Sequence, residues 1–272
     1  MHDLFDVTGR VAVVTGGVGQ LGKEFCKALL GAGAEVVIVD LPKEDDLRVR
    51  DTIDQLGRKS VQYVRASITS RNELVNALQE IQRLHSVPPH ILINNAALDS
   101  PPGSPAGENG PFESYPESSW DKVMEVNAKG VMLACQVFGG AMAQEGRGSI
   151  VNISSIYGLV SPDQDIYQYR RDRGEIFYKP VAYSASKSAL FNLTRYLATY
   201  WAKKGVRVNT LTLAGVFNRQ DESFLAEYCK RIPIGRMAQA DEYNGAVIFL
   251  ASDASKYMTG SNMVVDGGWT AW

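Results

Sequence analysis

Cysteine and histidine are both scarce in this sequence, and their scarcity narrows the chemistry that the chain can support. The 272 residues include three cysteines and three histidines. Cys26, Cys135 and Cys229 form no Cys-x-x-Cys pair, and no histidine lies near them at the spacing of metal ligands. An odd number of scattered cysteines fits a reducing compartment better than a disulfide framework. We therefore expect no metal and a cytoplasmic location.

Long apolar runs and blocks of like charge are also missing. The longest apolar runs, such as residues 11–14 and 36–39, have the length of buried strands and are too short to cross a bilayer. The first residues lack the basic stretch and apolar core of a signal peptide. The formal net charge is −2, with 28 basic and 30 acidic side chains spread along the chain. Neither a membrane nor a nucleic acid is therefore expected as a partner.

The chain does contain a regular alternation of short apolar runs and longer helical segments. The expected strands are residues 10–15, 35–40, 60–65, 91–94, 149–154, 206–211 and 262–265. The expected helices include residues 20–32, 71–84, 119–142, 182–203 and 241–251. This alternation indicates βαβ units and a parallel sheet covered by helices on both faces. We predict one α/β domain over residues 1–272, with a doubly wound parallel sheet of about seven strands.

Two stretches interrupt this alternation. Residues 99–116 contain five prolines and three glycines, and residues 161–180 are polar, aromatic and basic. Both are expected to be loops near the carboxyl edge of the sheet, where α/β folds bind ligands. Long loops in a compact domain are often functional, so we interpret them as lids over a site.

A glycine-rich segment follows the first expected strand and begins the first expected helix. Its sequence is Thr15-Gly16-Gly17-Val18-Gly19-Gln20-Leu21-Gly22. Glycines there allow close approach of the backbone to a pyrophosphate, and the free N–H groups of a helix N-terminus favour an anion. We predict a Rossmann fold with cofactor contacts from Gly16, Gly19, Gln20 and Leu21. The alternative is a turn whose glycines serve only packing.

An acidic residue stands at the end of the second expected strand. Asp40, followed by Leu41, can accept hydrogen bonds from the 2′- and 3′-hydroxyls of a ribose. The same carboxylate would repel a 2′-phosphate. The predicted cofactor is therefore NAD, with NADP disfavoured by Asp40, and with Asp40 and Leu41 among the contacts. A simple cap of the strand end is the alternative.

A phenol and an ammonium group lie four residues apart in Tyr183-Ser184-Ala185-Ser186-Lys187. Residues at this spacing share one face of a helix, so both side chains can point into one cleft. A free tyrosine has a pKa of about 10, and a nearby lysine charge or oxidised nicotinamide stabilises the phenolate and lowers that pKa. We expect a pair suited to proton exchange. The pair alone also occurs on ordinary amphipathic helices.

Four more segments favour a functional interpretation of the Tyr183 and Lys187 pair. They are Asn94-Asn95-Ala96-Ala97, Val126-Asn127-Ala128-Lys129-Gly130, Ile150-Val151-Asn152-Ile153-Ser154-Ser155-Ile156-Tyr157-Gly158 and Val265-Asp266-Gly267-Gly268. With the glycine-rich turn and the Tyr-x-x-x-Lys pair, they resemble the short-chain dehydrogenase/reductase family. The resemblance runs from residue 8 to the C-terminus in the order of the family.

The resemblance implies a catalytic set of Asn127, Ser155, Tyr183 and Lys187. Tyr183 would exchange the proton of the reacting hydroxyl, and Lys187 would bind the nicotinamide ribose. Ser155, rather than Ser154, would orient the substrate, and Asn127 would hold a water in the relay to Lys187. The resemblance also implies a homo-oligomer, a tetramer or a dimer, built through the helices of Tyr183 and Asn127 and the last strand.

Further cofactor contacts are implied at Ser67, Ile68, Asn94, Ala96, Val216 and Asn218. Several positions depart from the family pattern. Gln20 stands in place of a glycine of the turn, Ser67 in place of an aspartate facing the adenine, and Asn218 in place of a threonine. Ile68 could still contact the adenine through its backbone, and Val216 aligns with the residue whose backbone meets the carboxamide. These changes put local geometry in doubt more than cofactor binding.

The spacing before Tyr183 is the largest departure. Ser155 and Tyr183 lie 28 positions apart, more than is typical of the family. The extra segment, residues 163–179, carries Arg170, Arg171, Arg173, Lys179 and three tyrosines. Arginines bind carboxylates or phosphates through paired N–H groups, which suggests an acidic carbohydrate or an activated sugar as substrate. The alternative is a solvated loop whose charges pair with one another.

We therefore predict an NAD(H)-dependent oxidoreductase that interconverts a secondary alcohol and a ketone. Its small-molecule substrate is expected to be a sugar, sugar acid, polyol or activated sugar. These loops resemble those of bacterial oxidoreductases of sugar-acid or nonulosonic-acid (surface-glycan) metabolism. The alternatives are a reductase of a non-carbohydrate carbonyl (3-oxoacyl or steroid-like) and a non-catalytic NAD-binding protein.

Overall fold

The sheet of this protein is built from seven parallel strands. The computed structural model describes residues 4–58, 60–99 and 106–272, and the strands lie within these ranges. They are β1 (Val11–Thr15), β2 (Glu35–Asp40), β3 (Val61–Arg65), β4 (Ile91–Asn94), β5 (Gly148–Ser155), β6 (Val206–Leu213) and β7 (Asn262–Val265). Their order is β3-β2-β1-β4-β5-β6-β7. The strand order reverses direction beside β1, which confirms the predicted doubly wound sheet.

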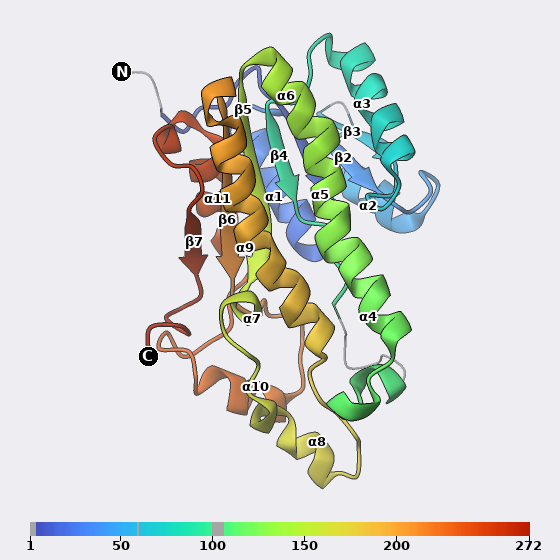
Figure 1. The fold of residues 1–272 in the computed structure, drawn as a ribbon, viewed down its shortest axis with the longest axis vertical. Helices are drawn as coiled ribbons and strands as arrows, with labels where there is room; N and C mark the ends of the chain where they lie inside the picture. The colour runs from blue at the N-terminus through green and yellow to red at the C-terminus, as the bar shows by residue number, and fades with distance from the viewer. Residues whose placement is uncertain (1–3, 59, 100–105) are drawn as a thin grey trace.

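Helices cover both faces of this sheet (Figure 1). The longer ones are α1 (Gln20–Gly31), α2 (Leu47–Leu56), α3 (Arg71–His85), α4 (Glu117–Met124), α9 (Val181–Trp201), α10 (Glu222–Cys229) and α11 (Asn244–Ala251). The shorter ones are α5 (Val131–Ala134), α6 (Gly140–Glu145), α7 (Ile156–Leu159) and α8 (Gln168–Asp172). Figure 1 shows α7, α8 and α10 beyond the carboxyl ends of the strands. This edge is where the cofactor and substrate sites were expected.

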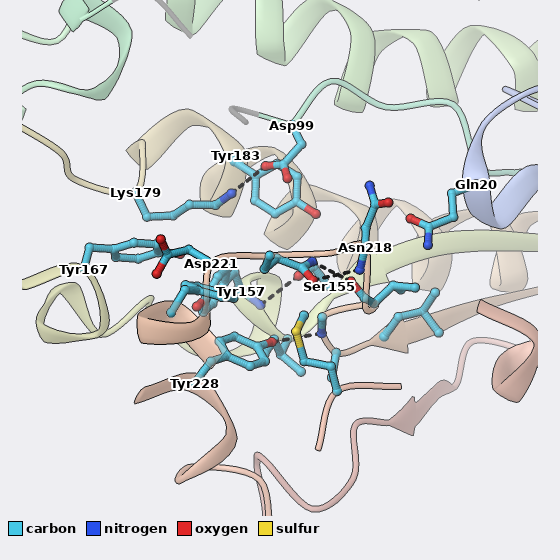
Figure 2. A pocket seen from close by; sticks show the side chains of 18 of the residues that line it. Gln20, Asp99, Ser155, Tyr157, Tyr167, Lys179, Tyr183, Asn218, Asp221 and Tyr228 are labelled. Carbon is cyan, nitrogen blue, oxygen red and sulfur yellow. Dashed lines mark hydrogen bonds and ion pairs between the residues drawn. The ribbon is translucent and has the colours of Figure 1, made fainter. Parts of the chain in front are cut away.

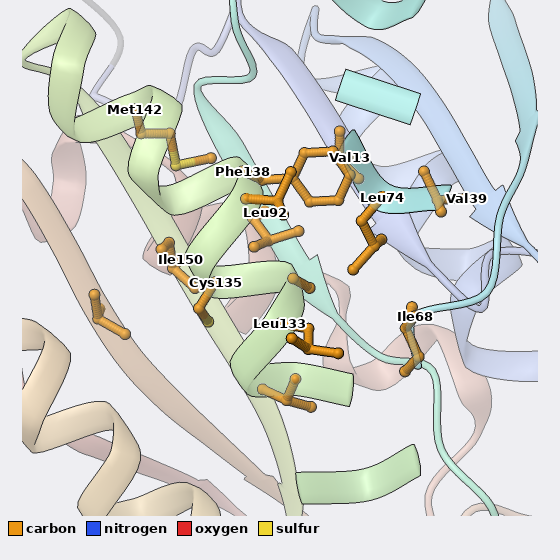
Figure 3. Close-up of a cluster of buried hydrophobic side chains, with 14 of the residues drawn as sticks. Val13, Val39, Ile68, Leu74, Leu92, Leu133, Cys135, Phe138, Met142 and Ile150 are labelled. Atoms are coloured by element: carbon orange, nitrogen blue, oxygen red, sulfur yellow. The ribbon is translucent and has the colours of Figure 1, made fainter. Parts of the chain in front are cut away.

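Alternate strand residues supply two separate cores. Val13 and Val37 pack with α3, with α9 and with the helical stretch from α4 to α6, which we call the long helix. Val14 and Ile38 pack with α1 and α11 on the other face. Figure 3 shows the first core, in which Leu74, Phe138 and Met142 meet strand residues. Strands buried on both faces read as continuous apolar runs, which is why the sequence pattern located them well.

The helix expected at residues 119–142 is longer and less regular than predicted. It runs from α4 to α6 through two π-helical segments, Glu125–Gly130 and Cys135–Gly139. A Cβ at Gly130 would lie 2.7 Å from Ile68 Cδ1, and one at Gly139 would lie 2.8 Å from the Trp201 ring. The two glycines therefore let this helix approach its neighbours closely. Such π segments recur at functional sites, and the first one contains Asn127.

The expectation of a loop over residues 161–180 is wrong for the middle of the segment. It contains a 3₁₀ turn (Gln164–Tyr167) and α8, and we call residues 163–179 the insert. Ile166, Tyr167 and Phe177 are buried in a third apolar cluster, with Tyr228 and Trp269. Arg171 donates hydrogen bonds to the carbonyl oxygens of Gln164 and Phe177. Tertiary packing, which no local pattern shows, therefore orders the insert.

The proline-rich stretch at residues 99–116 is only partly described. Its residues 100–105 lie outside the described part of the chain. The rest contains two 3₁₀ turns, Ala106–Asn109 and Phe112–Ser114. Tyr178 of the insert donates a backbone hydrogen bond to Asn109 O at 2.8 Å, so the two interrupting stretches meet. No helix in the described ranges is long and apolar enough to cross a bilayer.

Candidate active site

A cavity of about 760 Å³ lies at the carboxyl edge of the sheet. Its walls come from the ends of β5 and β6, the beginning of α9, the insert and α10 (Figure 2). Ser155, Tyr183 and Lys187 all line it, together with Gln20 and Val216. The fold thus brings together residues that the sequence separates widely. Cavities of this size hold small-molecule ligands in other proteins.

The glycine-rich turn begins directly after β1 and needs its glycines. Gly16 has φ +66°, and a Cβ there would lie 2.8 Å from Ala96 Cα. A Cβ on Gly22 would lie 2.2 Å from Gly16 O, so any side chain would push the turn apart. A Cβ on Gly19 would meet only Gly16 O, at 3.3 Å. The turn therefore keeps an open side at Gly19, where an anionic group could approach the N-terminus of α1.

Asn95, which the sequence analysis did not single out, locks this turn to β4. Its side-chain amide donates to Thr15 O at 3.1 Å and to Gly16 O at 3.0 Å. The Thr15 hydroxyl in turn accepts hydrogen bonds from the backbone N–H groups of Asn95 and Ala96. The neighbouring Asn94 is 2% exposed and donates to Asn152 Oδ1 at 2.8 Å. The Asn94 amide is thus used inside the core, so any cofactor contact of Asn94 falls to its backbone.

Gln20, the residue that replaces a glycine, bridges two parts of the site. It is the first residue of α1, and its side-chain Nε2 donates to Phe217 O at 2.9 Å. The segment after β6 is braced further by Gln220, which donates to Val216 O and accepts from Asn218 N. Val216 and Asn218 both line the cavity, as does Leu21. The departure at Gln20 thus ties the glycine-rich turn to the predicted nicotinamide side of the site.

Asp40 stands at the end of β2, beside the glycine-rich turn. Its two carboxylate oxygens accept hydrogen bonds from the backbone N–H groups of Val18, at 3.1 Å, and Leu41, at 2.8 Å. A carboxylate has about four lone-pair sites, so these two bonds leave acceptor capacity for ribose hydroxyls. Ser67, expected near the adenine, instead pairs its hydroxyl with Thr69 Oγ1 at 2.8 Å. The buried Ile68 side chain packs into the core beside α3.

Tyr183 lies in the first turn of α9, after Pro180. Ser155, which ends β5, lies close enough to this phenol to oppose the rise of its pKa, and its hydroxyl accepts from Tyr157 N at 3.2 Å. Ser154, the other candidate, donates to Lys187 O at 3.0 Å and is buried. The structure therefore brings Ser155, rather than Ser154, to the phenol.

Lys187 is 4% exposed and lies one helical turn beyond Tyr183. Its Nζ donates to Ile153 O at 2.9 Å and is 5.9 Å from the centre of the Tyr183 ring. Burial lowers the pKa of this ammonium to about 8, and the charge of Asp99 partly opposes that change. Keeping Lys187 charged inside the fold is therefore unfavourable and lowers the stability of the cofactor-free protein.

Asn127 belongs to the first π-helical segment and is fully buried where that segment faces α9. Its Oδ1 accepts from Leu98 N at 2.7 Å, and its Nδ2 donates to Leu98 O and to Ser186 Oγ. Ser186 itself donates to Tyr183 O at 2.7 Å. The side chain thus braces the backbone of Tyr183 through Ser186.

The protonation of Tyr183 differs from the expectation. Burial and the negative charge of Asp99 raise its pKa, while the nearby Ser155 lowers it. The expected lowering by Lys187 is wrong for the chain by itself, because loss of water around a phenolate outweighs the favourable contacts. The phenol of the cofactor-free protein is therefore protonated at neutral pH.

The arginines of the insert are all engaged by partners inside the fold. Arg170 pairs with Glu175 at 2.5 Å, and Arg173 pairs with Asp221 of the α10 N-cap at 3.3 Å. Arg171, which binds backbone carbonyls, does not line the cavity. These contacts favour the alternative of an internally paired segment. The hypothesis that the arginines bind an acidic substrate is not supported by their positions.

The segment Val265-Asp266-Gly267-Gly268 and the turn after it pack behind residues that line the cavity. Asp266 accepts from the N–H groups of Gly268 and Thr270, which fixes the last turn of the chain. That turn packs Trp269 against Tyr228, with ring centres 4.5 Å apart, and against Tyr157 in an edge-to-face contact. Tyr157 and Tyr228 line the cavity themselves (Figure 2). Trp269 therefore supports the residues that line this side of the cavity.

The residues at this edge fit a nicotinamide dinucleotide. A glycine turn that a Cβ would disrupt, an open helix N-terminus and a strand-end carboxylate lie in the order that the two phosphates and a ribose require. Within residues 4–58, 60–99 and 106–272, no group of three or more His, Cys, Asp or Glu side chains is arranged to hold a metal ion.

Several known proteins are similar to this chain in sequence and in fold. A family model described as enoyl-(acyl carrier protein) reductase matches residues 17–270. An NAD-dependent glycerol dehydrogenase of Listeria innocua is 32% identical, over 98% of this chain and 96% of its own length. A gluconate 5-dehydrogenase of Gluconobacter oxydans is also 32% identical, over 98% and 97% of the two chains. The structure of a gluconate 5-dehydrogenase from Burkholderia cenocepacia, in complex with NADP and tartrate, superimposes with a TM-score of 0.83 at 27% identity, covering 99% and 98%.

Proposed function

The chain belongs to the short-chain dehydrogenase/reductase family, and from this premise we propose that it interconverts a secondary alcohol and a ketone of a polyol, sugar or sugar acid with a nicotinamide cofactor. The observation that carries the proposal is the meeting of Ser155, Tyr183 and Lys187 at one cavity. Relatives named as glycerol, gluconate and arabinitol dehydrogenases support the substrate class. We propose one catalytic domain for the whole chain.

In the proposed mechanism, Tyr183 exchanges the proton of the reacting hydroxyl through its phenol oxygen. Ser155 holds the substrate oxygen beside that phenol, since the two side chains line the same cavity and Ser155 is near enough to affect the pKa of the phenol. Lys187 binds the nicotinamide ribose, and Asn127 contributes to the proton relay while bracing α9. When bound, the nicotinamide supplies the hydride donor or acceptor and, in its oxidised form, a positive charge. Burial keeps Tyr183 protonated in the free protein, which suits proton donation in the reductive direction.

The proposal is tested by a screen for formation of reduced nicotinamide. Purified protein is incubated with NAD and a panel of polyols, sugars, aldonic acids and activated sugars, and absorbance of the reduced cofactor is followed. We expect turnover of at least one polyhydroxylated compound. No turnover across the panel, together with measurable NAD binding, would support the non-catalytic alternative instead.

The preferred cofactor of this enzyme is proposed to be NAD. Relatives use either nucleotide, since one is named NAD-dependent and another binds NADP. Asp40 supports NAD because a carboxylate at the end of β2 would face a 2′-phosphate of NADP with like charge. The turn contacts at Gly16, Gly19, Gln20 and Leu21 are shared by both cofactors and do not discriminate.

Asp40→Asn should shift this preference toward NADP. The amide oxygen can still accept a backbone hydrogen bond, but the negative charge is gone. We expect the ratio of kcat/KM for NADP over NAD to rise at least about tenfold, because like-charge contacts cost several kcal/mol. Steady-state kinetics with both cofactors measures the ratio. Asp45→Asn, which changes an exposed acid in the loop that follows β2, is the matched control and should leave the ratio unchanged. An unchanged ratio in Asp40→Asn would assign cofactor choice elsewhere.

We also propose that the protein is a homo-oligomer and that it works in the cytoplasm. Tyr196 and Tyr200 stack on the outer face of α9 and are 63% and 59% exposed. They border a groove shared with Met132 and Gln136 of the long helix, and Figure 1 shows the two helices side by side. Exposed aromatic clusters of this kind mark protein contacts. The buried thiols of Cys26 and Cys135 fit a reducing compartment.

A Tyr196→Glu/Tyr200→Glu double variant should dissociate this oligomer. Placing two carboxylates in an apolar contact leaves charges without water or partners, which disfavours association. Light scattering coupled to gel filtration should give a multiple of the chain mass for the wild type and the single-chain mass for the variant. The matched change Tyr257→Glu, on a fully exposed tyrosine, should have no effect. A monomeric wild-type protein would overturn the proposal.

A further inference from the structure

One charged pair of the cavity has no place in the proposed mechanism. Lys179, the last residue of the insert, lies with its Nζ 2.5 Å from Asp99 Oδ1 and 4.8 Å from the centre of the Tyr183 ring. Its side chain is only 10% exposed. Figure 2 shows Asp99, Lys179 and Tyr183 together on one side of the cavity. A nearly buried ammonium beside the proton-exchanging phenol is thus part of the substrate surroundings.

The position of Lys179 is fixed by the insert. Gln164 accepts a hydrogen bond from Lys179 N at 2.9 Å and donates one to Lys179 O at 3.1 Å. Asp163, next to Gln164, forms an ion pair with Arg231 beyond α10. Pro180 follows at once and begins α9. The insert therefore fixes both the N–H and the carbonyl group of Lys179, and this positions the Lys179 ammonium beside the Tyr183 ring.

Each positive charge that the insert brings to the cavity has a negative partner. The pairs are Arg170 with Glu175, Arg173 with Asp221, and Lys179 with Asp99. All six side chains line the cavity. A substrate carboxylate beside Tyr183 would have to displace an existing partner and would lie near Asp99, a like charge. Contacts of that kind disfavour the wrong ligand by several kcal/mol in other sites, so this wall is matched to an uncharged molecule.

Another part of the cavity wall is aromatic. Tyr157, Tyr167 and Tyr228 line it, and Phe177 and Trp269 pack around them. Aromatic faces suit the C–H side of a polyhydroxylated chain, while its hydroxyls need donors and acceptors. A hydroxyl can accept from an ammonium and donate to a carboxylate at the same time. The Asp99–Lys179 pair offers both functions side by side.

We propose that the Asp99–Lys179 pair determines substrate specificity: it binds the hydroxyl groups next to the reacting carbon, and the preferred substrate is an uncharged polyol or sugar rather than a sugar acid. This inference rests on the proposed function and selects within its substrate class. It assigns the insert a role in recognition that does not involve its arginines. Arg219, which is exposed at the rim of the cavity, has no ion-pair partner among the described residues. It is therefore the cation that could bind the carboxylate of an acidic substrate.

The test compares alditols with the aldonates of the same carbon chain, in the galacto, gluco, manno and arabino series, at saturating NAD. The wild-type enzyme should prefer the best alditol over its aldonate by about tenfold or more in kcat/KM. Asp99→Asn removes the like charge and leaves Lys179 unpaired, so the aldonate should gain about tenfold relative to the alditol. Lys179→Met should raise KM for the alditol with a smaller change in kcat, without any gain for the aldonate.

The controls separate recognition from folding. Lys230→Met, in an exposed pair with Glu227, should match the wild type in every assay. Lys179→Arg keeps the positive charge, so its KM for the alditol should lie between those of the wild type and Lys179→Met. If all three proteins have the same melting temperature, a purely structural role of Lys179 does not predict this partial recovery. The inference is overturned if the wild-type enzyme prefers aldonates. It is also overturned if the wild-type preference between alditol and aldonate is lost in Arg219→Ala but kept in Asp99→Asn. Either result leaves the proposed function intact. Failure to turn over any member of the panel overturns both.

Discussion

Replacing Tyr183 with phenylalanine is expected to lower kcat about 10³-fold, because general acid–base groups contribute roughly 10²–10⁴-fold to such reactions. Phenylalanine keeps the ring that packs beside Lys179 and Lys187, so the change removes only the hydroxyl that faces the Ser155 side of the cavity. The loss should appear in both reaction directions. Stopped-flow or steady-state absorbance of reduced nicotinamide measures it with the substrate found in the screen.

Two further measurements show whether the hydroxyl acts as a proton donor and acceptor. Binding of NAD to Tyr183→Phe, followed by quenching of protein fluorescence, should stay within about threefold of the wild type, since few binding contacts are lost. Tyr257→Phe, which changes a fully exposed tyrosine in the same way, should keep full activity. A Tyr183→Phe enzyme that retains a tenth of its rate would show that another group moves the proton.

The parts of this site that are local in sequence were predictable. Gly16 and Gly22 precede a helix directly after a strand, and Asp40 ends the next strand, so each chemical requirement is visible within a few residues. Tyr183 and Lys187 share a helix face for the same reason. The parallel, doubly wound sheet could also be predicted, because apolar runs separated by helices indicate βαβ units.

The other parts depend on contacts between distant segments. Asp99 and Lys179 lie 80 positions apart, and the folding of the insert, with its buried Ile166 and Phe177, brings them together. The sequence left open whether the arginines of the insert bind a ligand or pair within the loop, and the fold gives each of them an internal partner. The direction of the Tyr183 pKa was missed for a related reason. It depends on burial, and burial is a property of the whole fold.

Replacing Lys187 with methionine should separate activity from stability. Turnover is expected to fall about 10²–10³-fold, because the methionine can neither bind a ribose hydroxyl nor support proton exchange at Tyr183. The cofactor-free variant should nevertheless be more stable than the wild type at pH 7. Lowering the pKa of Lys187 from 10.5 to about 8 corresponds to a cost of about 3 kcal/mol for holding the charged form in the fold. Loss of the hydrogen bond to Ile153 O offsets about 1 kcal/mol of the gain.

The pH dependence of this difference tests its cause. The folded pKa of Lys187 lies below the unfolded one, so between pH 8 and 10.5 the unfolded chain binds more protons and wild-type stability rises relative to the variant. The advantage of Lys187→Met should therefore be greatest below pH 8, about 2 kcal/mol, and nearly vanish by pH 9.5 to 10. Urea denaturation of both cofactor-free proteins across this range measures it, and Lys230→Met, on an exposed lysine, should show no such trend. A stability difference independent of pH would mean that Lys187 is not held as a desolvated cation, and that the site instead stabilises its charge before the cofactor arrives.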